Sequence, residues 1–178
     1  VDTNDPLIGS VWGLDSNHGV DAEVAWAISS GAEEIVVAVI DSGVDIAHAD
    51  LSTVIWSNDD EIPDNGIDDD GNGYIDDTYG WDFTGEYDNI PQDEHGHGTH
   101  VAGTIAAVRN NNEGIAGVAD NVKIMALRFL DKNGSGNTSW ALSALEYAVS
   151  NGAQISNNSW GGGGYESALY NAIASAGN

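Results

Sequence analysis

Residues 35–43 read Ile-Val-Val-Ala-Val-Ile-Asp-Ser-Gly, and they carry the strongest signal of the fold. Its first part, residues 35–40, is a continuous apolar run rich in β-branched side chains. Such a run is typical of a strand buried on both faces of a parallel sheet. Asp41 follows where the strand ends, and Ser42-Gly43 turns the chain. Functional groups in open α/β sheets gather beyond the carboxyl ends of the strands, so Asp41 is a candidate functional residue.

Beyond this strand, strand-like and helix-like segments alternate along the chain. Further strands are predicted at residues 122–130 and 153–158, and helices at 99–108, 138–149 and 165–176. The alternation predicts an α/β fold, a three-layer, doubly wound and mostly parallel sheet with helices on both faces. No internal repeat and no linker is visible, so we interpret the sequence as one domain.

Two other segments are less regular. A short helix is predicted over residues 21–30, with Asp21 as its N-cap and Gly31 as its stop. Residues 57–94 are acidic, rich in Gly and Asn, and without helical periodicity. This composition indicates a loop, with short strands near residues 79–83.

The chain is strongly acidic, with 29 acidic residues, 4 basic residues and a formal net charge of −25. A field of this sign repels nucleic acid and anionic membranes, so we expect neither as a partner. Half of the acidic residues, 14 of 29, lie between Asp59 and Glu94, which suggests bound cations beside the simpler role of charge in solubility. The absence of Cys excludes disulfides, thiolate metal sites and Cys nucleophiles.

The second motif is residues 95–103, which read His-Gly-His-Gly-Thr-His-Val-Ala-Gly. His97 opens a predicted helix, and a helix N-terminus disfavours the imidazolium, which helps to keep the side chain a neutral base. Taken alone, His97 could be a simple polar residue at a helix start, and Asp41 could cap the segment after it. A carboxylate and an imidazole in this order, 56 residues apart, instead indicate two members of a hydrolytic triad.

Together the two motifs resemble those of the subtilisin-like serine proteases (subtilases), most closely the thermitase-like branch, over essentially the whole chain. The resemblance implies that Asp41 orients His97 and supports its charged form. It also implies that His97 takes the proton of a nucleophilic Ser and returns it to the leaving amine. His100 is then structural, and His95 is interpreted as a solvated loop residue. The implied protein is a secreted, extracellular endopeptidase acting on protein or peptide substrates.

By resemblance, two glycine-rich segments form the edges of a substrate cleft, and one of them pairs with an extended peptide through backbone hydrogen bonds. The residues are Gly134, Ser135 and Gly136 on that edge, and Ser159, Trp160 and Gly161 on the opposite one. Trp160 replaces the Leu that is usual in the family. Without the two catalytic motifs, both segments would be interpreted as flexible loops.

The family's nucleophile motif, Gly-Thr-Ser-Met-Ala, is absent from these residues. Residues 176–178 spell Ala-Gly-Asn, as in the family's oxyanion segment, but they end a helical pattern over 167–176, so Asn178 is interpreted as a helix C-cap or loop residue. We expect residues 1–178 to be the N-terminal portion of a single catalytic domain. The Ser and the oxyanion Asn then lie on a missing or separate C-terminal segment, which is an expected partner of this chain. A pro-peptide or an inhibitor is a further candidate partner. The alternative is a calcium-binding structural or adhesion module with an inactive protease-like fold.

Residues 57–94 are interpreted as an acidic calcium-binding insertion because residues 68–73 hold the pattern Asp-x-Asp-x-Asn-Gly. This pattern places oxygen ligands at alternate loop positions before a glycine turn, as calcium loops do. The twelfth position is Tyr79 rather than Glu, so the loop is not a complete EF-hand. The expected ligands are Asp68, Asp70, Asn72 and the carbonyl of Tyr74, completed by Asp76 or Asp77. The alternative is an acidic solvated loop.

The resemblance implies a second Ca²⁺ site, which would tie the N-terminal arm to the body, and a weaker third one. The ligands of the second site are the side chains of Asp5, Asp50 and Asn111 and the carbonyls of Val108, Glu113 and Ile115. Those of the third are Asp82, Asp88, the carbonyl of Ile90 and Gln92.

Overall fold

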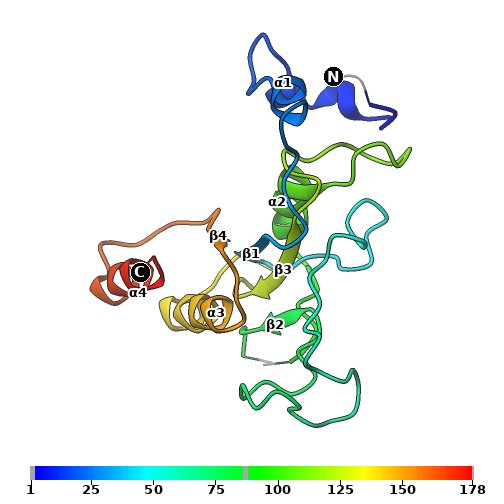
Figure 1. The fold of residues 1–178 in the computed structure, drawn as a ribbon. Coiled ribbons are helices and arrows are strands. Elements are labelled where there is room, and N and C mark those ends of the chain that lie inside the picture. The colour runs from blue at the N-terminus through cyan, green and yellow to red at the C-terminus, as the bar shows by residue number, and fades with distance from the viewer. Residues whose placement is uncertain (1–2, 86–87, 178) are drawn as a thin grey trace.

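The structure is a computed structural model and describes residues 3–85 and 88–177. Within these residues a parallel sheet has the strand order β2-β3-β1-β4 (Figure 1). The strands are β1 (Val36–Asp41), β2 (Gly80–Asp82), β3 (Lys123–Arg128) and β4 (Ile155–Asn157). The helices are α1 (Ala22–Trp26), α2 (His97–Ala106), α3 (Thr138–Ser150) and α4 (Ser167–Ala176), and short 3-10 helices lie at Ile8–Ser10 and Trp12–Leu14. No helix in the described ranges is long and apolar enough to cross a membrane.

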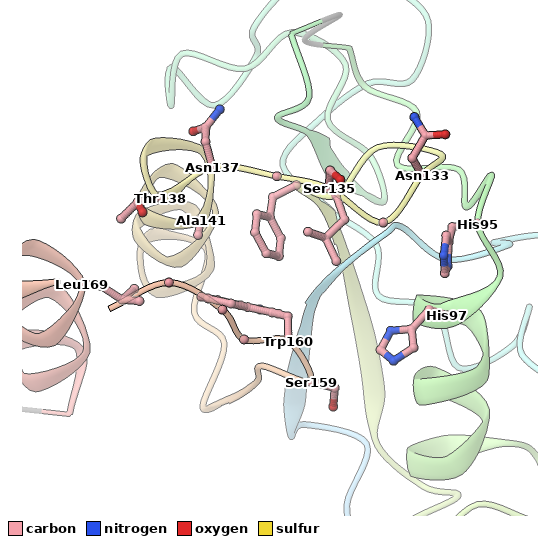
Figure 2. A pocket seen from close by; sticks show the side chains of 17 residues that line it. His95, His97, Asn133, Ser135, Asn137, Thr138, Ala141, Ser159, Trp160 and Leu169 are labelled. Atoms are coloured by element: carbon pink, nitrogen blue, oxygen red, sulfur yellow. The ribbon is translucent and has the colours of Figure 1, made fainter. Parts of the chain in front are cut away.

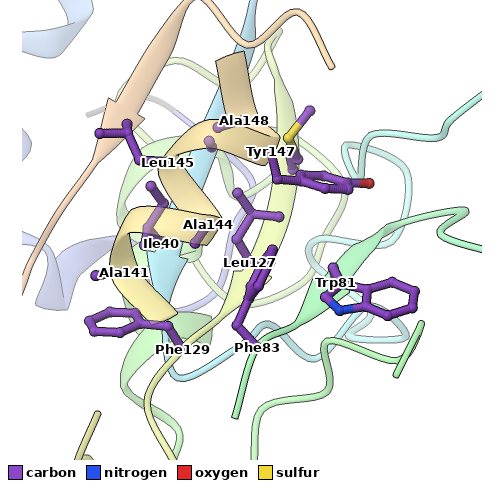
Figure 3. Close-up of a cluster of buried hydrophobic side chains, with 12 residues drawn as sticks. Ile40, Trp81, Phe83, Leu127, Phe129, Ala141, Ala144, Leu145, Tyr147 and Ala148 are labelled. Carbon is purple, nitrogen blue, oxygen red and sulfur yellow. The ribbon is translucent and has the colours of Figure 1, made fainter. Parts of the chain in front are cut away.

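β1 is central and supplies both hydrophobic cores. Successive side chains of a strand point to opposite faces. Accordingly, Ala38 and Ile40 enter the core that includes α3, and Val37 and Val39 enter the core that includes α2. Figure 3 shows the first of these cores, in which side chains of β1, β3 and α3 pack together. The predicted α/β fold, with helices on both faces of a parallel sheet, is therefore confirmed.

The N-terminal helix is shorter than the sequence predicts. α1 ends at Trp26, and Asp21 has φ 54° and makes no side-chain cap hydrogen bond. Helix-type backbone hydrogen bonds continue to Ser29, whose N–H donates to the carbonyl of Ala25, and tertiary contacts add to them. Trp26 Nε1 donates to the carbonyl of Val118 at 2.9 Å, and the Arg109 guanidinium lies 4.4 Å from the centroid of the Trp26 ring. The anchored tryptophan holds the segment to the body without a long helix.

The C-terminal elements form one edge of the fold. α4 ends at the predicted Ala176 but begins at Ser167, two residues after the predicted start, and its C-cap is Gly177. The interpretation of Asn178 lies outside the described residues. β4 is an edge strand of the sheet, and α4 contacts α3 (Figure 1). Their surface stays apolar and open, because Ile155 is 52 % exposed and Ile173 is 53 % exposed.

The carboxyl ends of β1 and β3 lie side by side at one edge of the sheet. In the parallel register, Asp41 of β1 pairs with Arg128 of β3. The helix α2 packs against β1 and begins at His97. Residues far apart in sequence therefore meet beyond this edge of the sheet, as the position of Asp41 predicts.

Candidate active site

Asp41 and His97 form a direct pair. The Oδ1 atom of Asp41 lies 2.7 Å from His97 Nδ1 and accepts a second hydrogen bond from the backbone N–H of Ser42 at 2.7 Å. An ionised carboxylate only accepts hydrogen bonds, so this contact assigns the imidazole proton to Nδ1 and leaves Nε2 as the acceptor. The arrangement is that of a base whose tautomer is set by a buried acid.

The two members of the pair differ sharply in exposure. The side chain of Asp41 is fully buried at 0 %, whereas that of His97 is 44 % exposed. Asp41 Oδ2 is also buried and has no hydrogen-bond partner among the described residues. A buried carboxylate favours a nearby cation, so Asp41 is suited to support an imidazolium formed on the exposed ring of His97.

A cavity of about 690 Å³ opens beside His97. Figure 2 shows His97 on one side of this cavity and Trp160 with Leu169 toward the other. All six residues expected to bind substrate line it, namely Gly134, Ser135, Gly136, Ser159, Trp160 and Gly161. Segments that are expected to form two edges of a cleft therefore do border one cavity.

Close packing explains one of the cleft glycines. A Cβ added at Gly136 would lie 2.5 Å from the carbonyl oxygen of Phe129, so a larger residue would push this edge away from the sheet. Gly134 has φ +74°, a conformation that favours glycine. These two glycines fit a fixed backbone edge rather than the flexible loop that the composition alone allows.

The far end of the cavity is apolar and includes residues that the sequence analysis missed. Trp160 packs on Phe129 with ring centroids 4.8 Å apart, and Ala141 and Leu169 add to the same wall. His95 also lines the cavity, with its ring centroid 6.3 Å from that of His97, although it is expected to be only a solvated loop residue. Ala141 lies in the first turn of the helix predicted after Gly136, so its position beside the cavity could have been predicted from the helical pattern. No local pattern marks Phe129 or His95.

Three carboxylates of the acidic segment converge, and they are only partly the calcium ligands that the sequence predicts. Glu61, Asp70 and Asp77 each offer an oxygen, and these oxygens lie within 4.8 Å of one another. Asp77 is fully buried. Carboxylate oxygens brought together in this way suit a hard cation such as Ca²⁺. Glu61 is absent from the ligand set expected from sequence, because it precedes the calcium-loop pattern and nothing in its spacing marks it.

Asp68 and Asp76 instead hold the loop backbone. Asp68 accepts hydrogen bonds from the N–H groups of Gly71, Asn72 and Gly73 at 2.8 to 3.1 Å. Asp76 accepts them from the N–H groups of residues 65 and 66 at 2.9 to 3.3 Å. Asn72 Nδ2 reaches both Asp70 and Asp77 at 3.0 Å, so its amide oxygen would have to turn inward to bind a cation. The N–H of Tyr74 donates to Asn72 Oδ1 at 2.8 Å.

The residues of the second expected calcium site also come together. Asp5 and Asp50 are buried at 2 % and 3 % exposure. Asp5 accepts from the N–H groups of residues 110 and 111, and Asp50 accepts from Asn111 Nδ2 at 2.8 Å and from the N–H of Ile115 at 2.9 Å. The loop that holds Val108 and Glu113 thus wraps two buried carboxylates from distant parts of the chain. Two buried carboxylates suit a calcium ion, whereas the Asn111 amide would have to turn, because its Nδ2 donates to Asp50 and its Oδ1 accepts from the N–H of Glu113.

At the third expected site a protein cation is already present. Arg128 Nη1 lies 3.4 Å from Asp82 Oδ2 and donates to the carbonyl of Gln92 at 3.1 Å, while Nη2 lies 2.6 Å from Glu94 Oε2. Burial raises the pKa of Asp82 above its usual range, although hydrogen bonds from Thr84 and the charge of Arg128 oppose this. The backbone N–H of Asp82 donates to the carbonyl of Asp88 at 2.9 Å. That of Ile90 donates to Asp88 Oδ1, also at 2.9 Å.

The chain is similar in sequence to known proteins. The subtilase family profile matches residues 32–178. The thermophilic serine proteinase of Bacillus sp. (strain AK1) is 38% identical over 151 residues, which are 85% of this chain and 32% of that protein. Thermitase of Thermoactinomyces vulgaris is 35% identical over 154 residues, 86% of this chain and 47% of that protein.

Solved structures give the same result. A protease from Pseudoalteromonas arctica PAMC 21717 superimposes with a TM-score of 0.79 at 30% identity, over 99% of this chain and 56% of that one. The chain belongs to the subtilase family, as its motifs predict. It spans between about a third and about half of the length of these relatives.

Proposed function

We propose that the whole protein is a serine endopeptidase in which Asp41 and His97 supply the acid and base of the triad. The observation that carries this proposal is the 2.7 Å contact between the buried carboxylate and an imidazole at the edge of a cavity. The nucleophilic Ser and the oxyanion Asn belong to a C-terminal segment outside residues 1–178. Subtilase membership supports this assignment of the reaction class.

The proposed reaction is acyl transfer from a peptide to the Ser and then to water. The Nε2 atom of His97 takes the proton of the Ser hydroxyl as it attacks the scissile carbonyl, and later gives that proton to the leaving amine. Asp41 Oδ1 holds Nδ1 throughout and stabilises the imidazolium. The backbone of Gly134 to Gly136 pairs with the extended substrate, and the apolar wall around Trp160 takes a large apolar side chain.

Two bound Ca²⁺ ions are proposed as structural cofactors. One lies among Glu61, Asp70 and Asp77, and the other between Asp5, Asp50 and the loop 108–115. Each would neutralise carboxylates of a chain that carries a net charge of −25, and the second would also join segments distant in sequence. At the weaker third site, the cation would compete with Arg128 for Asp82.

The proposal extends to partners and location. The exposed apolar surface of β4 and α4 fits the C-terminal remainder of the same catalytic domain, because an edge strand can pair further. Protein or peptide substrates follow from the family. Secretion to the outside of the cell, and binding of a pro-peptide or inhibitor, stay predictions from the resemblance.

The test uses the full-length protein and a chromogenic peptide substrate. We expect hydrolysis that phenylmethanesulfonyl fluoride blocks, and a fall of about a thousandfold or more in kcat for His97→Ala. The matched control, His18→Ala, changes an exposed histidine far from the cavity and should keep full activity. Cleavage that resists the reagent, or a His97→Ala variant with undiminished kcat, would contradict the proposal. A folded protein that binds Ca²⁺ and cleaves no peptide would favour the structural module.

A further inference from the structure

Asp93 lies where the chain enters α2 and accepts five hydrogen bonds. Its Oδ1 atom accepts from the N–H groups of His95 at 2.9 Å and Gly96 at 2.8 Å, and from Ser42 Oγ at 2.9 Å. Its Oδ2 atom accepts from the backbone N–H of Thr99 at 2.9 Å and from Thr99 Oγ1 at 2.7 Å. One carboxylate thus joins the loop before the helix, the first turn of the helix and the end of β1.

Ser42 connects this carboxylate to Asp41. It is buried at 1 % exposure, and its hydroxyl donates to Asp93 and accepts from the N–H of Gly98 at 2.9 Å. Its own backbone N–H donates to Asp41 Oδ1. The hydroxyl has one proton, so its donor and acceptor directions are both fixed by these partners.

The consequence is that the backbone is fixed on both sides of His97. The N–H before it, of Gly96, binds Asp93 directly, and the N–H after it, of Gly98, binds Ser42, which Asp93 also holds. We propose that Asp93, acting through Ser42, is a positioning residue that sets the distance and direction between His97 and Asp41. This inference rests on the proposed function, because positioning matters to rate only if the pair is catalytic.

Positioning predicts a specific kinetic effect. A displacement of about 1 Å in a catalytic group can lower the rate about a hundredfold. The alternative is that Asp93 and Ser42 only accept hydrogen bonds from the N–H groups at the start of α2 and have no effect on catalysis. A helix cap of that kind changes stability by about 1 kcal/mol and leaves the rate per folded molecule unchanged.

The experiment measures kcat and KM of the full-length enzyme per titrated active site, for Ser42→Ala and Asp93→Asn. We expect kcat to fall about 10- to 100-fold in each, with KM within about twofold of the parent value. The control is Asp15→Asn, because Asp15 Oδ1 also accepts backbone N–H groups, from residues 17 and 18, but lies far from the cavity. This control should leave kcat unchanged.

The same two substitutions are then made in a His97→Ala background. A residue that acts through His97 has nothing left to position, so the residual rate should change by less than about twofold. Unchanged kcat in Ser42→Ala and Asp93→Asn overturns the inference, as does an equal fall in both backgrounds. Failure of the proposed function gives a different result, since His97→Ala would then itself be active.

Discussion

The hydroxyl of Tyr147 donates a hydrogen bond to Asp77 Oδ2 at 2.5 Å, and both side chains are fully buried. Tyr147 belongs to α3, whose first turn borders the substrate cavity, whereas Asp77 belongs to the acidic segment. Burial and the neighbouring Asp77 raise the pKa of Tyr147 far above its usual value, so the hydroxyl remains a donor. The bond anchors the acidic segment to the body of the sheet.

Tyr147→Phe should therefore destabilise the fold. It leaves the buried carboxylate of Asp77 without one donor, a loss of about 1–3 kcal/mol. The melting temperature of the full-length protein should fall by roughly 2–10 °C, measured by calorimetry at fixed calcium. The matched control is Tyr170→Phe, at a side chain that is 61 % exposed on α4, where no change is expected. Equal melting temperatures for the two variants would count against the anchor.

Calcium should stabilise the protein through Glu61. At a free Ca²⁺ concentration a hundredfold above Kd, binding adds about 2.7 kcal/mol, or roughly 5–10 °C in melting temperature. Chelation should remove this gain from the parent protein, and Glu61→Gln should remove the part due to its own site. Glu34→Gln, which deletes the same charge from an exposed position, should respond to calcium as the parent does. A Glu61→Gln variant with the full calcium response would exclude this ligand.

Asp93 should make stability depend on pH in the acid range. Burial raises the pKa of Asp93, but hydrogen bonds from Thr99, Gly96 and His95 outweigh it, so the pKa lies below its usual value. A carboxylate with a depressed folded-state pKa adds stability that is complete above the unfolded value, near 3.9, and is lost as the pH falls through the folded value. Urea unfolding should show Asp93→Asn about 1 kcal/mol less stable than the parent at pH 7.

That difference should shrink as the pH falls from about 3.9 through the depressed folded-state pKa of Asp93, because the parent carboxylate is then protonated too. Comparing the two proteins at each pH cancels the titration of the other carboxylates. A gap that persists unchanged into the acid range would mean that the lost bonds, rather than the lost charge, account for the effect.

Trp160 should govern the binding of apolar side chains. Trp160→Ala removes part of the apolar wall formed with Phe129, so KM for peptides with a large apolar side chain near the cleaved bond should rise about tenfold, which corresponds to about 1.4 kcal/mol. Small side chains should be much less affected. The comparison is a series of peptides differing at one position, with Trp12→Ala, at a side chain 69 % exposed, as control. Equal loss for all peptides would remove Trp160 from the proposed binding wall.

Much of the site is visible in local sequence patterns. Asp41 ends an unbroken apolar strand, which the continuous apolar run marks. His97 begins a helix, which the helical spacing of the apolar residues after it marks. α4 spans residues 167–176, where its helical periodicity lies. α1 is shorter than its pattern and ends at Trp26, whose side chain contacts Val118 and Arg109 from a loop far along the chain.

Local sequence patterns were thus enough to predict the class of fold, the family and the meeting of Asp41 with His97, because these depend on period, order and the ends of regular elements. Tertiary structure decided which of the many carboxylates meet: Glu61 joins Asp77, while Asp68 turns inward to its own loop. It also decided that Arg128 faces Asp82 and that Asp93 holds both sides of His97. In an acidic chain the spacing of carboxylates along the sequence does not show which of them meet, because the distances between their side chains are set only when the loops fold.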